Sequence, residues 1–173
     1  MKMRLDDVRL SFPNVFRRAV FAGEETKYGA TLLLDKAAHA KPIRELLAAI
    51  ASKVKTDLGG VKLPADRLCL RDGDESAYDG YAGCVSLRAS NNSRPLVLNR
   101  DRTPLTEDDG VIYAGCYVNA IVELWSQDNQ WGKRINCNLL GVQFVRDGDP
   151  FGDGGRVASA DEFDVVSDER MPF

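Results

Sequence analysis

One stretch of the sequence constrains the fold more than any other, because it alternates residue types as a β-strand does. It runs from Val111 to Trp125. Successive side chains of a strand point to opposite faces, so a period of two predicts one buried face and one outer face. Trp125 belongs to the set expected on the outer face. The set expected in the core is Cys116, Val118, Ala120, Val122 and Leu124.

The segment that follows predicts the returning strand of a hairpin. Ser126–Lys133 is polar and predicts the hairpin loop, and Arg134–Arg146 predicts the second strand. Within that strand the apolar positions change parity between Leu139 and Leu140. A change of parity indicates one extra residue, so we expect a β-bulge there.

The rest of the chain predicts further strands and one long helix. We expect strands at residues 3–10, 27–34, 81–90 and 96–99, and a polar loop at residues 63–79. A helix is expected at residues 36–58, ended by Gly59 and Gly60. Its apolar residues recur every three or four positions: Ile43, Leu46, Leu47, Ile50, Val54 and Leu58. A mainly β chain with one long helix and long loops fits an OB-fold, a five-stranded Greek-key barrel. A mixed α+β sandwich is the alternative.

The charge pattern divides the chain into a body, residues 1–146, and a tail, residues 147–173. The tail has eight acidic residues against two basic ones, a net charge of −6, and the whole chain carries −3, so the body carries +3. Four glycines between positions 148 and 155 disfavour helix and strand, so we expect a disordered acidic tail. A solubilising tail is one interpretation. The other is a docking segment whose end binds a partner: Asp168, Glu169, Met171, Pro172 and Phe173.

Composition and motifs argue against several other classes of protein. No apolar run is long enough to span a membrane, and the N-terminal residues lack a signal core, so we expect a cytoplasmic protein. Phosphate-loop, serine-hydrolase and zinc-protease motifs are missing, so we do not expect an enzyme. Asp72, Asp74 and Glu75 leave a metal-dependent nuclease as the weaker alternative, beside a protein–protein adaptor.

The cysteines and the single histidine, His39, do not predict a metal site. Zinc sites usually take closely spaced ligand pairs, and the chain has no C-x-x-C pair. We therefore expect buried thiols, with no metal and no cofactor. The four cysteines are Cys69, Cys84, Cys116 and Cys137.

The predicted β-hairpin carries the materials of a single-stranded DNA site. Proteins hold single strands on aromatic platforms inside a basic groove, and an OB-fold often uses the loop between its last two strands. Both tryptophans of the chain, Trp125 and Trp131, flank this loop, and Lys133 and Arg134 follow it. The alternative for Trp131 is that it folds back to cap the barrel.

Other basic and aromatic residues extend the predicted interface. Tyrosines at the starts of strands are stacking candidates, with Tyr78 as a further one, and the body charge of +3 suits a binder of single strands better than one of duplexes. An ordinary solvated hairpin is the alternative for residues 88–94. The candidates are Lys27, Tyr28, Tyr81, Arg88, Arg94, Arg100 and Arg102.

Four blocks of the sequence resemble a family of phage and prophage single-stranded DNA-binding proteins: residues 8–16, 28–36, 79–83 and 111–119. The resemblance covers about residues 3–146. It implies an OB-fold, sequence-tolerant binding of single-stranded DNA, and a role in phage DNA replication or recombination in the host cytoplasm. The tail is similar to the Pro-Phe tips of bacterial single-stranded DNA-binding proteins, which implies that it recruits replication or recombination enzymes. A homodimer is compatible with the sequence.

Overall fold

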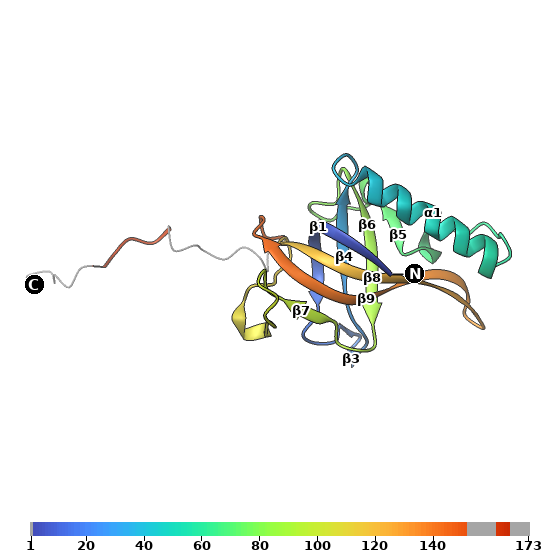
Figure 1. Cartoon of the computed structure of the whole chain (residues 1–173). Coiled ribbons are helices and arrows are strands. Elements are labelled where there is room, and N and C mark those ends of the chain that lie inside the picture. Colours follow the sequence, from blue (N-terminus) through green and yellow to red (C-terminus); the bar gives the residue numbers. More distant parts are fainter. Residues whose placement is uncertain (1, 152–161, 167–173) are drawn as a thin grey trace, which may run out of the picture.

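The strands close into the five-stranded barrel that the sequence predicted (Figure 1). The computed structural model describes residues 2–151 and 162–166. The barrel strands are β1 (Lys2–Asn14), β4 (Tyr28–Asp35), β6 (Cys84–Asn91), β8 (Tyr117–Asn129) and β9 (Gly132–Arg146). Neighbours pair in the order β6-β4-β1-β8-β9, and a parallel contact between Ser90 and Asn138 joins β9 back to β6. This closed barrel with one long helix confirms the OB-fold.

Shorter elements fill the connections between the barrel strands. β2 (Val20–Phe21) and β3 (Glu24–Glu25) form a small hairpin between β1 and β4. β5 (Leu70–Asp72) pairs with β6, and β7 (Leu96–Leu98) pairs with β9. The single-turn helices are η1 (Ala65–Arg67), η2 (Gly73–Glu75) and η3 (Glu107–Asp109). The predicted polar loop at residues 63–79 is therefore only partly irregular.

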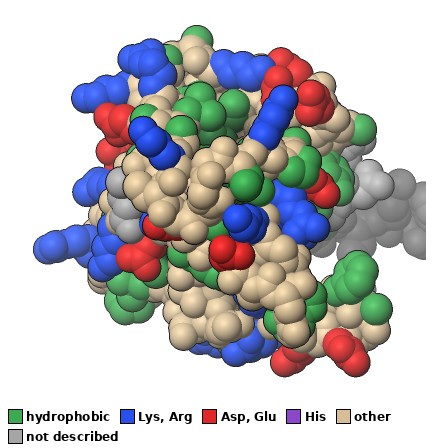
Figure 2. Space-filling view, turned by 90° about the vertical axis from the view of Figure 1, so that its right-hand side faces the viewer, with side chains coloured by type: hydrophobic (Ala, Val, Ile, Leu, Met, Phe, Trp, Pro, Cys, Tyr) green, Lys and Arg blue, Asp and Glu red, His purple; other side chains and the backbone are tan. Residues whose placement is uncertain are grey.

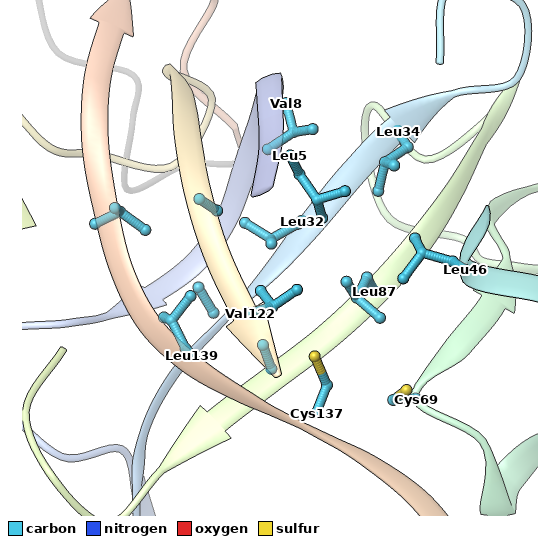
Figure 3. Packing of buried hydrophobic residues seen from close by; sticks show 14 of the residues in the cluster. Leu5, Val8, Leu32, Leu34, Leu46, Cys69, Leu87, Val122, Cys137 and Leu139 are labelled. Carbon is cyan, nitrogen blue, oxygen red and sulfur yellow. The ribbon is translucent and has the colours of Figure 1, made fainter. Parts of the chain in front are cut away.

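The barrel interior is apolar, as the alternation of β8 predicted (Figure 3). All five residues expected in the core, from Cys116 to Leu124, are buried. The expected β-bulge is confirmed, because Ile121 pairs with Gly141 and the next residue, Val122, pairs with Leu139. Leu140 is the extra residue. The cysteines are free thiols, three of them buried and Cys84 half-buried, as expected.

The one long helix, α1 (Ala40–Asp57), begins four residues later than predicted. Asp35 accepts hydrogen bonds from the backbone N–H groups of Ala37 and Ala38, at 2.9 and 2.8 Å, and this turn delays the helix. α1 packs Leu46 and Ile50 onto the core, whereas Leu47, expected on the same face, is 54% exposed. Among the described residues, no helix has the length and apolar character needed to cross a membrane.

Two strand ends differ from the sequence expectation. β1 continues through Phe12 and Pro13 to Asn14, because the backbone accommodates Pro13 at an irregularity in its pairing with β4. β8 begins at Tyr117 rather than Val111 and runs on to Asn129. The predicted loop at residues 126–133 is therefore wrong. Its polar residues pair across the two strands, and only Gln130 and Trp131 form the turn.

Candidate nucleic-acid interface

The outer face of the second and third barrel strands is where OB-folds bind oligonucleotides. Those strands are β4 and β6 here. Ser11 of β1 pairs with Thr31 of β4, and Thr31 pairs with Arg88 of β6. Directly paired residues share a face of the sheet, so these three side chains form one row across three strands. Arg88 is exposed, and hydrogen bonds from its guanidinium to other described residues are absent. The row therefore ends in a cation open to solvent.

An aromatic patch, which we define as Phe12, Tyr78 and Tyr81, stands at the other end of this row. The Tyr81 hydroxyl donates a 3.0 Å hydrogen bond to Ser11. Phe12 and Tyr78 meet edge to face with their ring centroids 4.9 Å apart, and Tyr78 lies 5.3 Å from Tyr81. Phe12 is 50% exposed and Tyr78 61% exposed. Two rings are thus open to solvent beside Ser11, which lies two strand spacings, about 10 Å, from Arg88 along the row.

The backbone of Phe12 explains why its ring points outward. Phe12 has φ of 48°, and the β1–β4 register shifts between Ser11 and Asn14. A bulky residue in the left-handed region is unfavourable, and such positions concentrate at functional sites. The sequence analysis missed Phe12, because an apolar residue next to a proline indicates a strand end. The signal that could have found it is the Phe-Pro pair inside a longer strand.

Tyr81, predicted as a stacking residue, lies beneath the surface in this structure. Its side chain is buried, with 5% exposure, because the loop from β5 to β6 folds back over β1. The ring supports Tyr78 from below instead. Tyr78, a further candidate in the sequence, is the tyrosine that this loop presents to solvent.

A polar latch, Lys36 with Asp72 and Asp74, holds that loop in place. The Lys36 ammonium contacts both carboxylates at 2.7 Å, and the Gly83 N–H donates to Asp74 at 2.7 Å. These bonds lower the pKa of Asp72, mainly through Lys36, and that of Asp74, mainly through the Gly83 N–H. They also raise the pKa of Lys36. Two of the three carboxylates considered for a nuclease, Asp72 and Asp74, thus bind a lysine, and the described residues contain no metal-ligand cluster.

The β8–β9 hairpin arranges the predicted Trp and Lys-Arg residues differently. Trp131, at the turn, is 69% exposed, so it does not cap the barrel. Trp125 is half-buried, and its buried indole N–H has no hydrogen-bond partner among residues 2–151 and 162–166. Lys133 donates to the Leu58 carbonyl at 3.1 Å, and Arg134 donates to the Asp66 carbonyl at 3.2 Å. Both cations therefore tie the hairpin to the end of α1 and the segment that follows it.

The remaining predicted residues lie at separate places. Tyr28 is half-buried under the Arg18 guanidinium, 5.0 Å from its ring, and Lys27 is exposed. Arg94 donates to the Phe16 carbonyl at 3.0 Å. Arg100 packs over the Phe144 ring, and Arg102 is exposed. On the face shown in Figure 2, basic side chains stand apart with acidic ones between them rather than in one continuous stripe.

The first residues of the predicted tail lie against the barrel. The Phe151 ring stacks 4.1 Å from the Arg9 guanidinium, and the Tyr113 hydroxyl donates to Asp147 at 2.9 Å. A side chain at Gly80 would collide with Phe151. The contacts of the body thus continue to Phe151, five residues beyond the boundary predicted at 146. The predicted docking residues Asp168, Glu169, Met171, Pro172 and Phe173 lie outside the described residues.

Comparison with known proteins gives matches over nearly the whole chain. Residues 1–171 match the family model described as the single-stranded DNA-binding protein of Enterobacter phage Enc34. Putative protein p50 of Acyrthosiphon pisum secondary endosymbiont phage 1 is 45% identical over 177 residues, covering 96% of this chain and 95% of that protein.

Solved structures are similar as well. The single-stranded DNA-binding protein of bacteriophage Enc34 is 34% identical, with a TM-score of 0.78 over 94% of this chain and 90% of that one. The same phage protein in complex with single-stranded DNA gives 33% identity and a TM-score of 0.75, over 87% of this chain and 89% of that one. Bacteriophage T7 gp2.5, at 12% identity and a TM-score of 0.52 over 95% of this chain and 98% of that one, shares the fold.

Proposed function

The chain belongs to the family of phage single-stranded DNA-binding proteins represented by that of Enterobacter phage Enc34, and from this we propose that it binds single-stranded DNA without sequence preference. One observation supports the location: the row Ser11, Thr31 and Arg88, with the open rings of Phe12 and Tyr78 at its end. Bases stack on the rings, and Arg88 contacts the phosphates.

The loops beside this face extend the proposed site. Lys27 follows the β2–β3 hairpin, and Trp131 stands at the tip of the β8–β9 hairpin, so both belong to loops that OB-folds use for oligonucleotides. Both side chains are exposed, and within the described chain neither forms a hydrogen bond or an ion pair. Only their backbone groups are hydrogen-bonded. Four further candidates remain untested, and in this structure each donates to a backbone carbonyl: Lys133, Arg134, Arg94 and Arg100. Arg102, Tyr28 and Trp125 also remain untested.

Titration of the tryptophan fluorescence tests this function. We expect quenching by a dT oligonucleotide of roughly 30 bases, weaker quenching by a duplex, and lower affinity at higher salt, because phosphate contacts release counterions. The absence of binding to single strands in both fluorescence and gel shift would refute the proposal. Binding without salt dependence would refute the phosphate contacts alone.

We place the protein in phage DNA replication or recombination in the host cytoplasm, with the acidic tail recruiting enzymes of that process. The tail carries a net charge of −6 and ends in Met-Pro-Phe, which supports both docking on a basic partner and competition with DNA for the same cations. A chain ending at Phe151 keeps the contacts with Arg9. We expect it to bind DNA more tightly than the full chain, and equal affinity would refute the competition.

A further inference from the structure

The β2–β3 hairpin is a firmly held projection whose apolar side chains are not covered by any described residue. Val20 and Phe21 are 67% and 78% exposed. Ala22 and Gly23 form the turn with φ of 52° and 81°, and two positive φ values give the tight turn that suits a hairpin.

The base of this hairpin is closed by backbone bonds, and Arg18 ties it to the residue after β6. Ala19 donates to the Lys27 carbonyl at 2.8 Å, and Thr26 donates to Ala19 at 2.7 Å. Arg18 bonds the carbonyls of Thr26 and Asn92, at 3.0 and 2.7 Å. Burying an exposed apolar side chain removes its surface from water and lowers the free energy. Apolar side chains held in place on an exposed hairpin therefore point to a binding partner.

The neighbours of Phe21 indicate what kind of partner fits. Glu24 pairs directly with Phe21, and Glu25 pairs with Val20. Both glutamates are exposed, and within the described part of the chain neither forms an ion pair. Carboxylates beside the ring repel phosphates, so the tip of this hairpin favours a protein surface, whereas Lys27 after its base stays open to DNA. The complementary surface is an apolar groove with a basic rim.

The chain itself carries such a groove, which we call the α1 groove, between the second half of α1 and the segment after it. It has a volume of about 430 Å³ and is open to solvent. The Lys55 ammonium lies on its lining and is exposed, without an ion pair among the described residues. The apolar lining consists of Ile50, Ala51, Val54, Val61, Leu63 and Leu68.

We propose that Phe21 of one copy docks in the α1 groove of a second copy, with Glu24 facing Lys55. Figure 1 places the hairpin at the bottom of the barrel and α1 at the upper right, so the two surfaces lie on different sides. Because the two surfaces lie on different sides, the contact is heterologous, and heterologous contacts join copies into rings or open rows. Copies bound along one DNA strand would form a row.

The size of the contact determines where it acts. One hairpin in one groove buries far less than the roughly 1,200 Å² of a stable interface, so free copies associate weakly. Copies on one DNA strand are held side by side, which raises their effective concentration. The contact therefore makes the protein fill long single strands cooperatively. This inference goes beyond the proposed DNA binding and concerns a different part of the surface.

The test uses the full chain with two dT oligonucleotides, the shortest that binds one copy and one several times longer. We expect cooperative filling of the long oligonucleotide. Phe21→Ser and Ala51→Glu should each lower the cooperativity on the order of tenfold, the effect of losing one buried ring, and leave single-copy affinity unchanged. Leu47→Ser is the matched control, because it also replaces an exposed apolar side chain with serine but lies on α1 outside the groove. It should change neither the cooperativity nor the single-copy affinity.

A charge exchange tests the pairing of the two surfaces. Glu24→Lys or Lys55→Glu alone should weaken cooperativity, and the double variant should restore it. Non-cooperative filling by the unmodified chain would overturn the proposal. So would a loss of single-copy affinity in Phe21→Ser, because Phe21 would then touch DNA. If a chain ending at residue 166 loses cooperativity and Phe21→Ser does not, the groove holds the tail end instead. Failure of DNA binding itself would appear as no binding to the short oligonucleotide.

Discussion

The aromatic patch and the β8–β9 hairpin both lie near cations, yet only the cation beside the patch is free. In the hairpin the Trp131 ring is exposed and both cations are engaged. In the hairpin, Lys133 and Arg134 bond the backbone next to α1, and the indole N–H of Trp125 is buried. At the patch, Phe12 and Tyr78 are half or more exposed, and Arg88 is open to solvent. A basic or aromatic residue is available to a ligand only where the fold has not used it. Four predictions test this difference.

Removing both open rings of the patch should have the largest effect. We expect Phe12→Ala with Tyr78→Ala to weaken binding to dT on the order of a hundredfold, because each stacked base contributes about 1–3 kcal/mol. Gel shifts measure the affinity. Phe163→Ala is the matched control, since this ring is also exposed, at 72%, and lies far along the chain from the patch. Unchanged affinity of the double variant would move the site away from β4 and β6.

The second prediction is that Trp131 and Trp125 differ in their contributions to DNA binding and to the fluorescence change. Trp131→Ala should weaken binding about tenfold, the loss of one stacked base. Trp131→Phe should remove most of the DNA-induced change in fluorescence, and Trp125→Phe should keep it, because Trp131 is 69% exposed whereas Trp125 is half-buried. The reverse result would make Trp125 the reporting residue and give the hairpin stem a direct role.

The third prediction is that removing Arg88 affects DNA binding, whereas removing Lys133 affects the stability of the fold. Arg88→Ala should weaken binding a few-fold and reduce the salt slope by about one, as the loss of a phosphate contact does. Lys133→Ala should leave the salt slope unchanged and lower the free energy of unfolding by about 1 kcal/mol, since it loses a hydrogen bond to Leu58. Salt titrations and urea unfolding distinguish them. A reduced slope for Lys133→Ala would show that this cation leaves Leu58 for DNA.

The smallest effect should come from pH acting on the polar latch. Asp72 and Asp74 have pKa values lowered from 3.8, so their contribution to stability is present above about pH 4 and lost as the pH falls through the lowered values. Lys36 has its pKa raised from 10.5, so its contribution is lost only above that pH. The protection of the Gly83 amide, meaning its exchange rate compared with that of an unstructured amide at the same pH, should therefore fall at acidic pH. Lys36→Met should show faster exchange already at neutral pH, and unchanged exchange would mean that the latch does not hold the loop.

The barrel could be predicted from the sequence because its strands carry their own pattern. The alternation from Cys116 to Leu124 and the change of parity at Leu140 follow from burial, which selects residue types one by one. The length of the β8–β9 hairpin could not be predicted from the sequence. Its polar side chains satisfy each other across the strands, as Asn136 does by donating to Gln127 at 3.0 Å, so a paired ribbon resembles a loop in composition.

The site was harder to predict than the fold, because it depends on tertiary contacts. Arg88 was predicted as a DNA-binding candidate, and its side chain is exposed on β6. Phe12 owes its outward ring to an irregular backbone, and Tyr81 owes its burial to a loop held by Lys36. Residue type and local spacing contain neither fact.

The loop from β5 to β6 is fixed at both ends, by the polar latch and by the bond from Tyr81 to Ser11. Between these anchors lie Ser76, Ala77, Tyr78 and Asp79, none of them in the barrel core. Mutations there leave the barrel core unchanged. With DNA bound as proposed, a different ring at position 78, or a longer segment, changes the affinity for DNA while the barrel stays the same.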